Sequence, residues 1–249
     1  GSAVKGQPDF VYGNVLGSNL FNSLFILGVA GLIYPLNVLK NTGRIELPIS
    51  FFIVLLVLLQ SHDAFCGFEN NVLSRLDGGV LFLGFIAFLY YAFKTIKNET
   101  QDDEEIKKMP AWKSVLLVIV GIAGLVFGGN WVLNGSVAVA QSFDISERII
   151  GLTILAVSTS LPELVTSVVA AMKKNSDIAV GNVVGSNIFN ILGILGLSAM
   201  VYPTPFSTTI NFDLIVLMIA TVLIFVMLFI GTKFQKGFYT MNKWQAFVF

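Results

Sequence analysis

A single carboxylate stands in the middle of a long apolar stretch of this sequence. Glu163 follows a proline and a run of hydroxyls in the segment STSLPEL at 158–164. An acidic side chain inside an apolar span is costly unless it faces partners or water, which makes Glu163 a functional candidate. Pro162 has no N–H, and its ring clashes with the Ser158 carbonyl four residues back, so we expect a kinked or broken helix with that carbonyl freed.

The chemistry available here is that of hard oxygen donors. Thr159 and Glu163 are four residues apart, which predicts that they share one face of a helix. A hydroxyl, a freed backbone carbonyl and a carboxylate can then converge on one point. Such ligands suit sodium and calcium, and they do not suit zinc or copper.

The next apolar segment, GNVVGSNIFN at 181–190, offers further polar oxygens. Asn182, Ser186 and Asn190 step by four along one predicted helical face, and their oxygens can complete the shell of a cation. Small polar residues in membranes also simply hydrogen-bond neighbouring helices. Both interpretations stay open for Asn182 and Asn187, and for Asn14 and Asn19 in the similar segment GNVLGSNLFN at 13–22. We interpret the glycines of these segments as sites of close helix packing: Gly13, Gly17, Gly181 and Gly185.

Composition places these segments in a membrane. Hydrophobic residues make up 55% of the 249 residues, and charged residues only 12%. Soluble domains carry about 25% charged residues. The mean hydropathy is +0.81 and the formal net charge is zero, so we expect a lipid bilayer around the chain and no nucleic-acid partner. The lone Cys66 excludes an intrachain disulfide.

The spacing of apolar runs predicts an all-α membrane protein. A spanning helix needs about 20 apolar residues. We expect about seven complete spans and an eighth that begins after Trp244 and is cut short. The apolar runs fall near 10–34, 46–60, 79–96, 114–140, 149–172, 178–202 and 212–231.

An internal repeat organises the chain. Residues 9–36 align without a gap with 177–204, an offset of 168 residues (177 minus 9), and the two copies share GNV, GSN, FN and YP. The predicted spans cross the membrane an odd number of times between equivalent points, so the copies should point in opposite directions. If the loop at 97–113 is cytoplasmic, only three basic residues fall on the opposite side of the membrane: Lys5, Arg75 and Arg148. This distribution agrees with the positive-inside rule. Inverted repeats are typical of secondary transporters, which bind substrate where the copies meet.

At these motifs the sequence resembles the sodium/calcium exchanger family of the cation/calcium antiporter superfamily. Family members carry GTSxPE on one helix and GNxxGSNxxN or GNxxGSNxxD on the next; Ser158 replaces the first glycine here. The resemblance implies an inverted-repeat antiporter fold of ten helices. It also implies a set of metal-binding residues: Glu163, Thr159, Ser160, Ser186, Asn190, Ser18, Asn22 and Ala156.

The resemblance further implies what the protein does. We expect a monomeric transport unit in the cell membrane that exchanges sodium ions for calcium ions by alternating access, with no cofactor and no enzymatic activity. A calcium/proton antiporter, in which Glu163 carries the proton, and a passive cation channel stay open as alternatives. In the potassium-dependent branch the last position of the second-repeat motif is acidic. Because Asn190 occupies it here, we expect potassium-independent exchange.

The repeat also predicts how the chain is divided. We expect a first half at 1–96, a cytoplasmic linker at 97–113 and a second half at 114–249. By comparison between the copies, two helices before the first copy and most of the last helix are expected to be missing. By resemblance, the missing helices would carry a first-repeat GTSxPE with a second acidic ligand.

Overall fold

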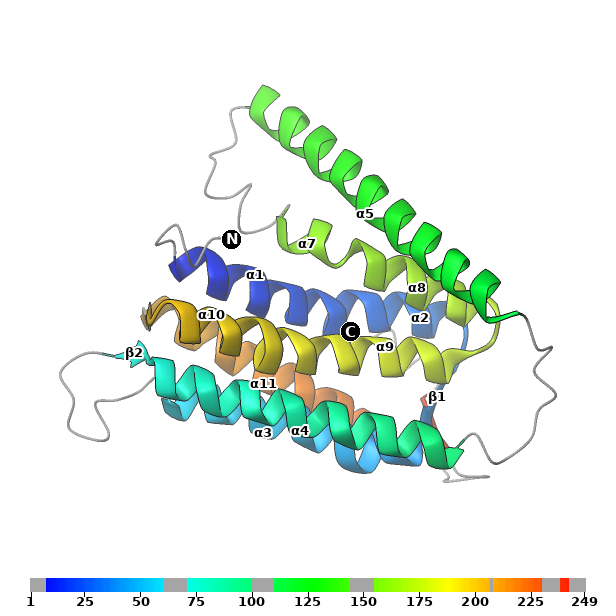
Figure 1. The fold of residues 1–249 in the computed structure, drawn as a ribbon, viewed down its shortest axis with the longest axis horizontal. Coiled ribbons are helices and arrows are strands. Elements are labelled where there is room, and N and C mark those ends of the chain that lie inside the picture. The colour runs from blue at the N-terminus through cyan, green and yellow to red at the C-terminus, as the bar shows by residue number, and fades with distance from the viewer. Residues whose placement is uncertain are drawn as a thin grey trace.

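The protein is described by a computed structural model that covers residues 8–60, 71–99, 110–143, 155–206, 208–229 and 238–241. Within these ranges it is an almost entirely helical bundle (Figure 1). Segments labelled η are π-helical. In chain order the helices are α1 (Pro8–Leu20), η1 (Phe21–Ile26), α2 (Leu27–Ile33), η2 (Thr42–Glu46), α3 (Leu47–Gln60), α4 (Arg75–Glu99), α5 (Ala111–Ser142), α7 (Leu155–Thr159), α8 (Leu161–Met172), α9 (Ser176–Ile188), η5 (Phe189–Leu195), α10 (Gly196–Val201) and α11 (Thr208–Phe229).

The described residues include six helices that are long and apolar enough to cross a membrane. The short run at 46–60 gains the preceding π-helical turn, and the helix spans Thr42–Gln60 over 19 residues. The run at 149–172 is divided into α7 and α8. The chain is therefore an integral, multi-pass, all-α membrane protein, as predicted. The eighth run, after Trp244, lies outside the described residues, and the number of spans in the whole fold stays a prediction.

The predicted repeat reappears in the boundaries of the helices. α1 and η1 begin 168 residues before α9 and η5 respectively, and each copy switches to π-helical turns at the same phenylalanine, Phe21 or Phe189. α2 begins 169 residues before α10. Each copy ends at an extended tyrosine, Tyr34 with φ −146° and ψ 139°, and Tyr202 with φ −140° and ψ 115°. The two copies run in opposite directions through the bundle (Figure 1).

Two short antiparallel ribbons continue the same symmetry. β1 (Leu36–Leu39) pairs with β4 (Phe238–Met241), and β2 (Val72–Leu73) pairs with β3 (Thr204–Pro205). Leu36 faces Met241 in one ribbon, and the repeat-related Thr204 faces Leu73 in the other. The ribbons lie toward opposite ends of the bundle (Figure 1). The inverted repeat therefore relates tertiary pairings as well as sequence motifs.

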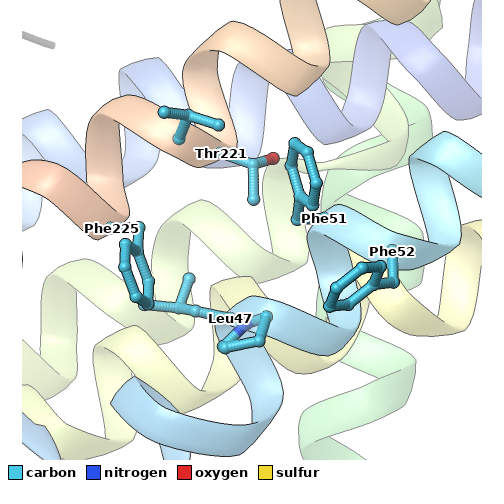
Figure 2. Close-up of a pocket in the computed structure, with 7 residues that line it drawn as sticks. Leu47, Phe51, Phe52, Thr221 and Phe225 are labelled. Carbon is cyan, nitrogen blue, oxygen red and sulfur yellow. The ribbon is translucent and has the colours of Figure 1, made fainter.

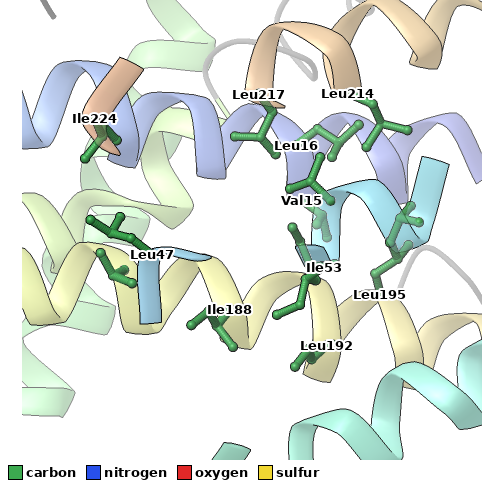
Figure 3. Packing of buried hydrophobic residues seen from close by; sticks show 14 of the residues in the cluster. Val15, Leu16, Leu47, Ile53, Ile188, Leu192, Leu195, Leu214, Leu217 and Ile224 are labelled. Carbon is green, nitrogen blue, oxygen red and sulfur yellow. The ribbon is translucent and has the colours of Figure 1, made fainter. Parts of the chain in front are cut away.

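The core lies between the two repeat copies and the helices α3 and α11. Leu16, Ile188, Leu195 and Leu217 are at most 1% exposed and interdigitate there (Figure 3). Outward-facing surfaces are also apolar, most of all on α5, where Leu117 is 58% exposed. A soluble protein would not present a helix like this to water, whereas hydrocarbon accommodates it.

Two of the four glycines predicted as packing sites can be compared with the structure, and Gly13 and Gly17 stay predictions. A Cβ at Gly181 or Gly185 would meet no neighbouring atom of the described residues within 4 Å, so the interpretation of these two as packing sites is wrong. The closest approach joins α4 to α10. A Cβ at Gly78 would lie 2.7 Å from the Gly196 carbonyl oxygen, and one at Gly196 would lie 3.0 Å from the Leu81 Cβ. Small residues allow backbones in membranes to come this close.

Candidate functional site

The helix carrying STSLPEL is broken just before the proline, as predicted. α7 ends at Thr159, Ser160 leaves helical geometry with φ −97° and ψ 3°, and α8 begins at Leu161. The Ser160 N–H donates to the Val157 carbonyl at 3.1 Å, which tightens the last turn of α7. The expected shared helical face of Thr159 and Glu163 is wrong, because the two residues belong to different helices on either side of the break.

Thr159 is tied across the bundle to the first copy of the repeat. Its hydroxyl donates to the Asn14 Oδ1 at 3.1 Å and lies 3.0 Å from the Ser18 Oγ. Because the single proton of Thr159 is used toward Asn14, Ser18 is the donor in the second bond. These bonds fix the end of α7 against α1, so two of the predicted hydroxyl ligands, Thr159 and Ser18, lie side by side.

Glu163 lies in the first turn of α8, partly buried against α9. Its backbone carbonyl accepts a hydrogen bond from the Asn182 Nδ2 at 3.2 Å, and the same nitrogen donates to the Ser167 Oγ at 3.0 Å. Asn182 therefore binds the backbone of α8. The carboxylate oxygen Oε2 of Glu163 is buried, and no group of the described residues hydrogen-bonds it. A buried carboxylate oxygen without a donor is costly, and a bound cation would remove that cost.

Asn22 and Ser186 meet where η1 packs against α9. The Asn22 Nδ2 donates to the Ser186 Oγ at 3.2 Å, and Ser186 donates in turn to the Val183 carbonyl at 3.1 Å. Asn22 is fully buried, and its Oδ1 has no hydrogen-bond partner among the described residues. Two acceptor oxygens, on Glu163 and Asn22, are thus buried and left open to a positive ligand.

The remaining predicted residues occupy the same region. Ser160 is buried at the helix break, and Ala156 lies on α7. Asn190 lies on η5 and donates its amide to the Asn19 Oδ1 at 2.9 Å. The structure therefore joins Thr159 to Ser18 and Asn22 to Ser186, and it gives Asn190 a partner that sequence reasoning missed. The assignment of these residues as ion ligands stays a prediction.

Sequence reasoning left the role of Asn19 and Asn187 open. Asn19 is fully buried and Asn187 is 9% exposed. They are separated by the repeat offset of 168 residues and hydrogen-bond each other's backbone carbonyl. That offset was the signal that could have revealed them, because residues on the axis of an inverted repeat contact their own equivalents.

Negative charge is sparse in this region. Among the described residues there is no group of three or more His, Cys, Asp or Glu side chains that could hold a metal ion. A cation here would depend on Glu163 together with neutral oxygens from hydroxyls, amides and backbone carbonyls. Such a shell is compatible with weakly held, exchangeable ions of the alkali and alkaline-earth type.

A cavity elsewhere in the bundle is of a different kind. It has a volume of about 270 Å³ and lies between α3 and α11, lined by Leu47, Pro48, Phe51, Phe52, Thr221, Val222 and Phe225 (Figure 2). Its one hydroxyl, on Thr221, donates to the Leu217 carbonyl of its own helix at 2.8 Å. Because it offers neither a carboxylate nor an amide, this pocket is unsuited to a cation.

The fold and the site define an integral membrane protein built from an inverted helical repeat around a polar midline. The model of the sodium/calcium exchanger protein family matches residues 2–94 and 113–249. The chain belongs to this family, which confirms the resemblance seen in the motifs.

Comparison with individual relatives agrees with this family membership. Inner membrane protein YrbG of Escherichia coli (strain K12) is 36% identical over 219 residues, which cover 81% of this chain and 63% of the relative, so the chain spans less than two thirds of that protein. Sodium/calcium exchanger MaX1 of Methanosarcina acetivorans is 31% identical over 285 residues, covering 99% of this chain and 79% of the relative. A solved structure of the sodium-calcium exchanger NCX_Mj, soaked with Na+ and Sr2+, matches 99% of this chain and 75% of that chain, with 28% identity and a TM-score of 0.78.

Proposed function

We propose that the protein is a secondary antiporter that exchanges sodium for calcium across a membrane by alternating access. The observation that carries the proposal is the pair of buried, unpartnered acceptor oxygens, Glu163 Oε2 and Asn22 Oδ1. Asn22 belongs to the first copy of the repeat, and Glu163 lies on α8, the helix before the second copy. Transporters of this architecture bind substrate where the two copies meet. Family membership and the likeness to MaX1 support the same activity.

The chemistry of the site accounts for coupling between two ions. Calcium takes six to eight oxygen ligands, and the same carboxylate, hydroxyl and amide oxygens also suit sodium. Because both ions need Glu163, only one kind can occupy its carboxylate at a time. An empty site leaves an uncompensated buried charge, which disfavours the change between inward-open and outward-open states. Transport then proceeds only with an ion bound, so the flux of sodium is coupled to the opposite flux of calcium.

The proposal is tested on the full-length protein in sodium-loaded proteoliposomes. Glu163→Gln keeps the size of the side chain and removes its charge, and we expect it to abolish sodium-driven calcium uptake. Asp177→Asn is the matched control, because it also removes one carboxylate charge but lies at the start of the neighbouring helix α9, away from the break. Uptake retained in Glu163→Gln, or lost equally in both variants, would contradict the assignment.

A calcium/proton antiporter is the second candidate, since a carboxylate with one buried oxygen that lacks a donor, as in Glu163, can also take up a proton. The same vesicles separate the two functions. Sodium exchange requires calcium uptake to follow an imposed sodium gradient at constant pH. Uptake driven by a proton gradient in sodium-free buffer would establish the second candidate, and calcium flux without any counter-ion would indicate a passive channel.

A further inference from the structure

Four asparagines form a continuous hydrogen-bonded chain across the repeat axis. At its centre, the Asn19 Nδ2 donates to the Asn187 carbonyl at 3.1 Å, and the Asn187 Nδ2 donates to the Asn19 carbonyl at 3.5 Å. At its two ends, the Asn22 Nδ2 donates to the Asn187 Oδ1 at 3.1 Å and the Asn190 Nδ2 donates to the Asn19 Oδ1 at 2.9 Å. In each pair, the offset of 168 residues converts one bond into the other.

The direction of every bond in this chain follows from its centre. A backbone carbonyl can only accept, so the amide groups of Asn19 and Asn187 must present their nitrogens to it. Their oxygens then necessarily face outward along the chain. An outward-facing oxygen requires a donor, so the outer asparagines, Asn22 and Asn190, must present their nitrogens inward and their own oxygens to the far side.

The outer amides are the ones that the ion would meet. In Asn22 the nitrogen is used toward Asn187 and Ser186, whereas the buried Oδ1 has no partner among the described residues. If this amide were reversed, it would present an NH2 group to a cation, which repels it. The bond from Asn22 to Asn187 is therefore what gives Asn22 the polarity of a cation ligand.

The inner pair is poorly placed to bind the ion itself. The Asn187 Nδ2 also donates to the Ser23 Oγ at 2.7 Å, so both polar ends of this amide are engaged. The cavity that touches Asn19 and Asn187 has a volume of about 10 Å³, which is room for about one water molecule. Five of the nine residues that line it are aliphatic and none carries a carboxylate, so a calcium ion would not find the six or more oxygen ligands that it needs there.

We propose that Asn19 and Asn187 are positioning residues, which use the two backbone carbonyls on the repeat axis to hold the amides of Asn22 and Asn190 with their oxygens toward the transported ion. This inference rests on the proposed function, because it takes Asn22 and Asn190 as ion ligands. It gives the asparagines of the two GSN motifs, Asn19 and Asn187, a role distinct from that of the ion ligands around them.

The test is a double-mutant cycle read by calorimetric titration of calcium into the purified full-length protein in sodium-free buffer. Asn187→Leu keeps the side-chain size and removes the acceptor, so the amide of Asn22 can reverse. We expect calcium affinity to fall about tenfold, the scale of one hydrogen bond to a charged group. In an Asn22→Asp background the carboxylate has no amide to orient, so adding Asn187→Leu is expected to leave affinity unchanged or to raise it.

A role in packing alone would lower affinity equally in both backgrounds, and that result would overturn the proposal, as would an unchanged affinity in Asn187→Leu. The symmetric cycle, Asn19→Leu with and without Asn190→Asp, applies the same criterion if the first variant does not fold. Calcium titration does not depend on the counter-ion, so a failure of sodium coupling leaves this test intact. A wild-type protein that does not bind calcium would overturn both the inference and the proposed function.

Discussion

Replacing Gly78 by alanine should force α4 away from α10. The added Cβ would lie 2.7 Å from the Gly196 carbonyl oxygen, 2.7 Å from the Met200 backbone nitrogen and 2.9 Å from the Ala199 Cβ. Ordinary contacts begin at 3.4 Å, so the shortfall is several tenths of an ångström on three sides. Because two of the three atoms belong to the backbone, no side-chain rotation relieves the clash, and the helices themselves must separate.

The size of the effect follows from two opposing contributions. Overpacking a close contact costs about 1–3 kcal/mol, whereas alanine in place of glycine favours a helix by about 1 kcal/mol. The neighbouring Gly79 supplies a matched control, since a Cβ there would meet nothing within 4 Å among the described residues. Gly79→Ala gains the helical contribution without the clash, so the difference between the two variants isolates about 1–3 kcal/mol of overpacking.

The assay is the melting temperature of the purified full-length protein in detergent. For a chain of this size, 1 kcal/mol shifts the midpoint by roughly 2–4 °C. We expect Gly78→Ala to melt several degrees below Gly79→Ala. If the two variants melted at the same temperature, the close crossing of α4 and α10 at this glycine would be wrong.

Three further predictions address the site and its supports. Pro162→Ala restores an N–H and should join α7 to α8, so we expect normal expression but a loss of sodium-driven calcium uptake in proteoliposomes. Uptake should be equal when potassium is replaced by choline, because Asn190 carries no charge to balance an extra ion; a requirement for potassium would contradict this. Ser74→Ala should lower stability by about 1 kcal/mol, seen as a lower melting temperature, because the Ser74 Oγ caps α4 by accepting a hydrogen bond from the Asp77 N–H at 3.2 Å.

The membrane environment, the repeat and the break before Pro162 could all be predicted from the amino-acid sequence. Each of these depends on local or periodic properties of the chain. Apolar runs need a bilayer wherever they pack, a proline interrupts a helix in any context, and a gapless repeat requires two copies of one substructure. The motifs also pointed to the residues around Glu163 before any contact was known.

Tertiary structure alone decided which polar groups meet. Thr159 hydrogen-bonds Ser18, 141 residues away in the chain, and Asn190 hydrogen-bonds Asn19, 171 residues away. Spacing within one helix could not foresee these pairs, because each pair joins two helices that are far apart in the chain. The π-helical turns that begin at Phe21 and Phe189 also change the helical phase before Asn22 and Asn190. The orientation of an amide depends on where its donor and acceptor partners lie in space. The distinction between the outer asparagines, whose oxygens are available to an ion, and the inner pair that orients them therefore exists only in the folded protein.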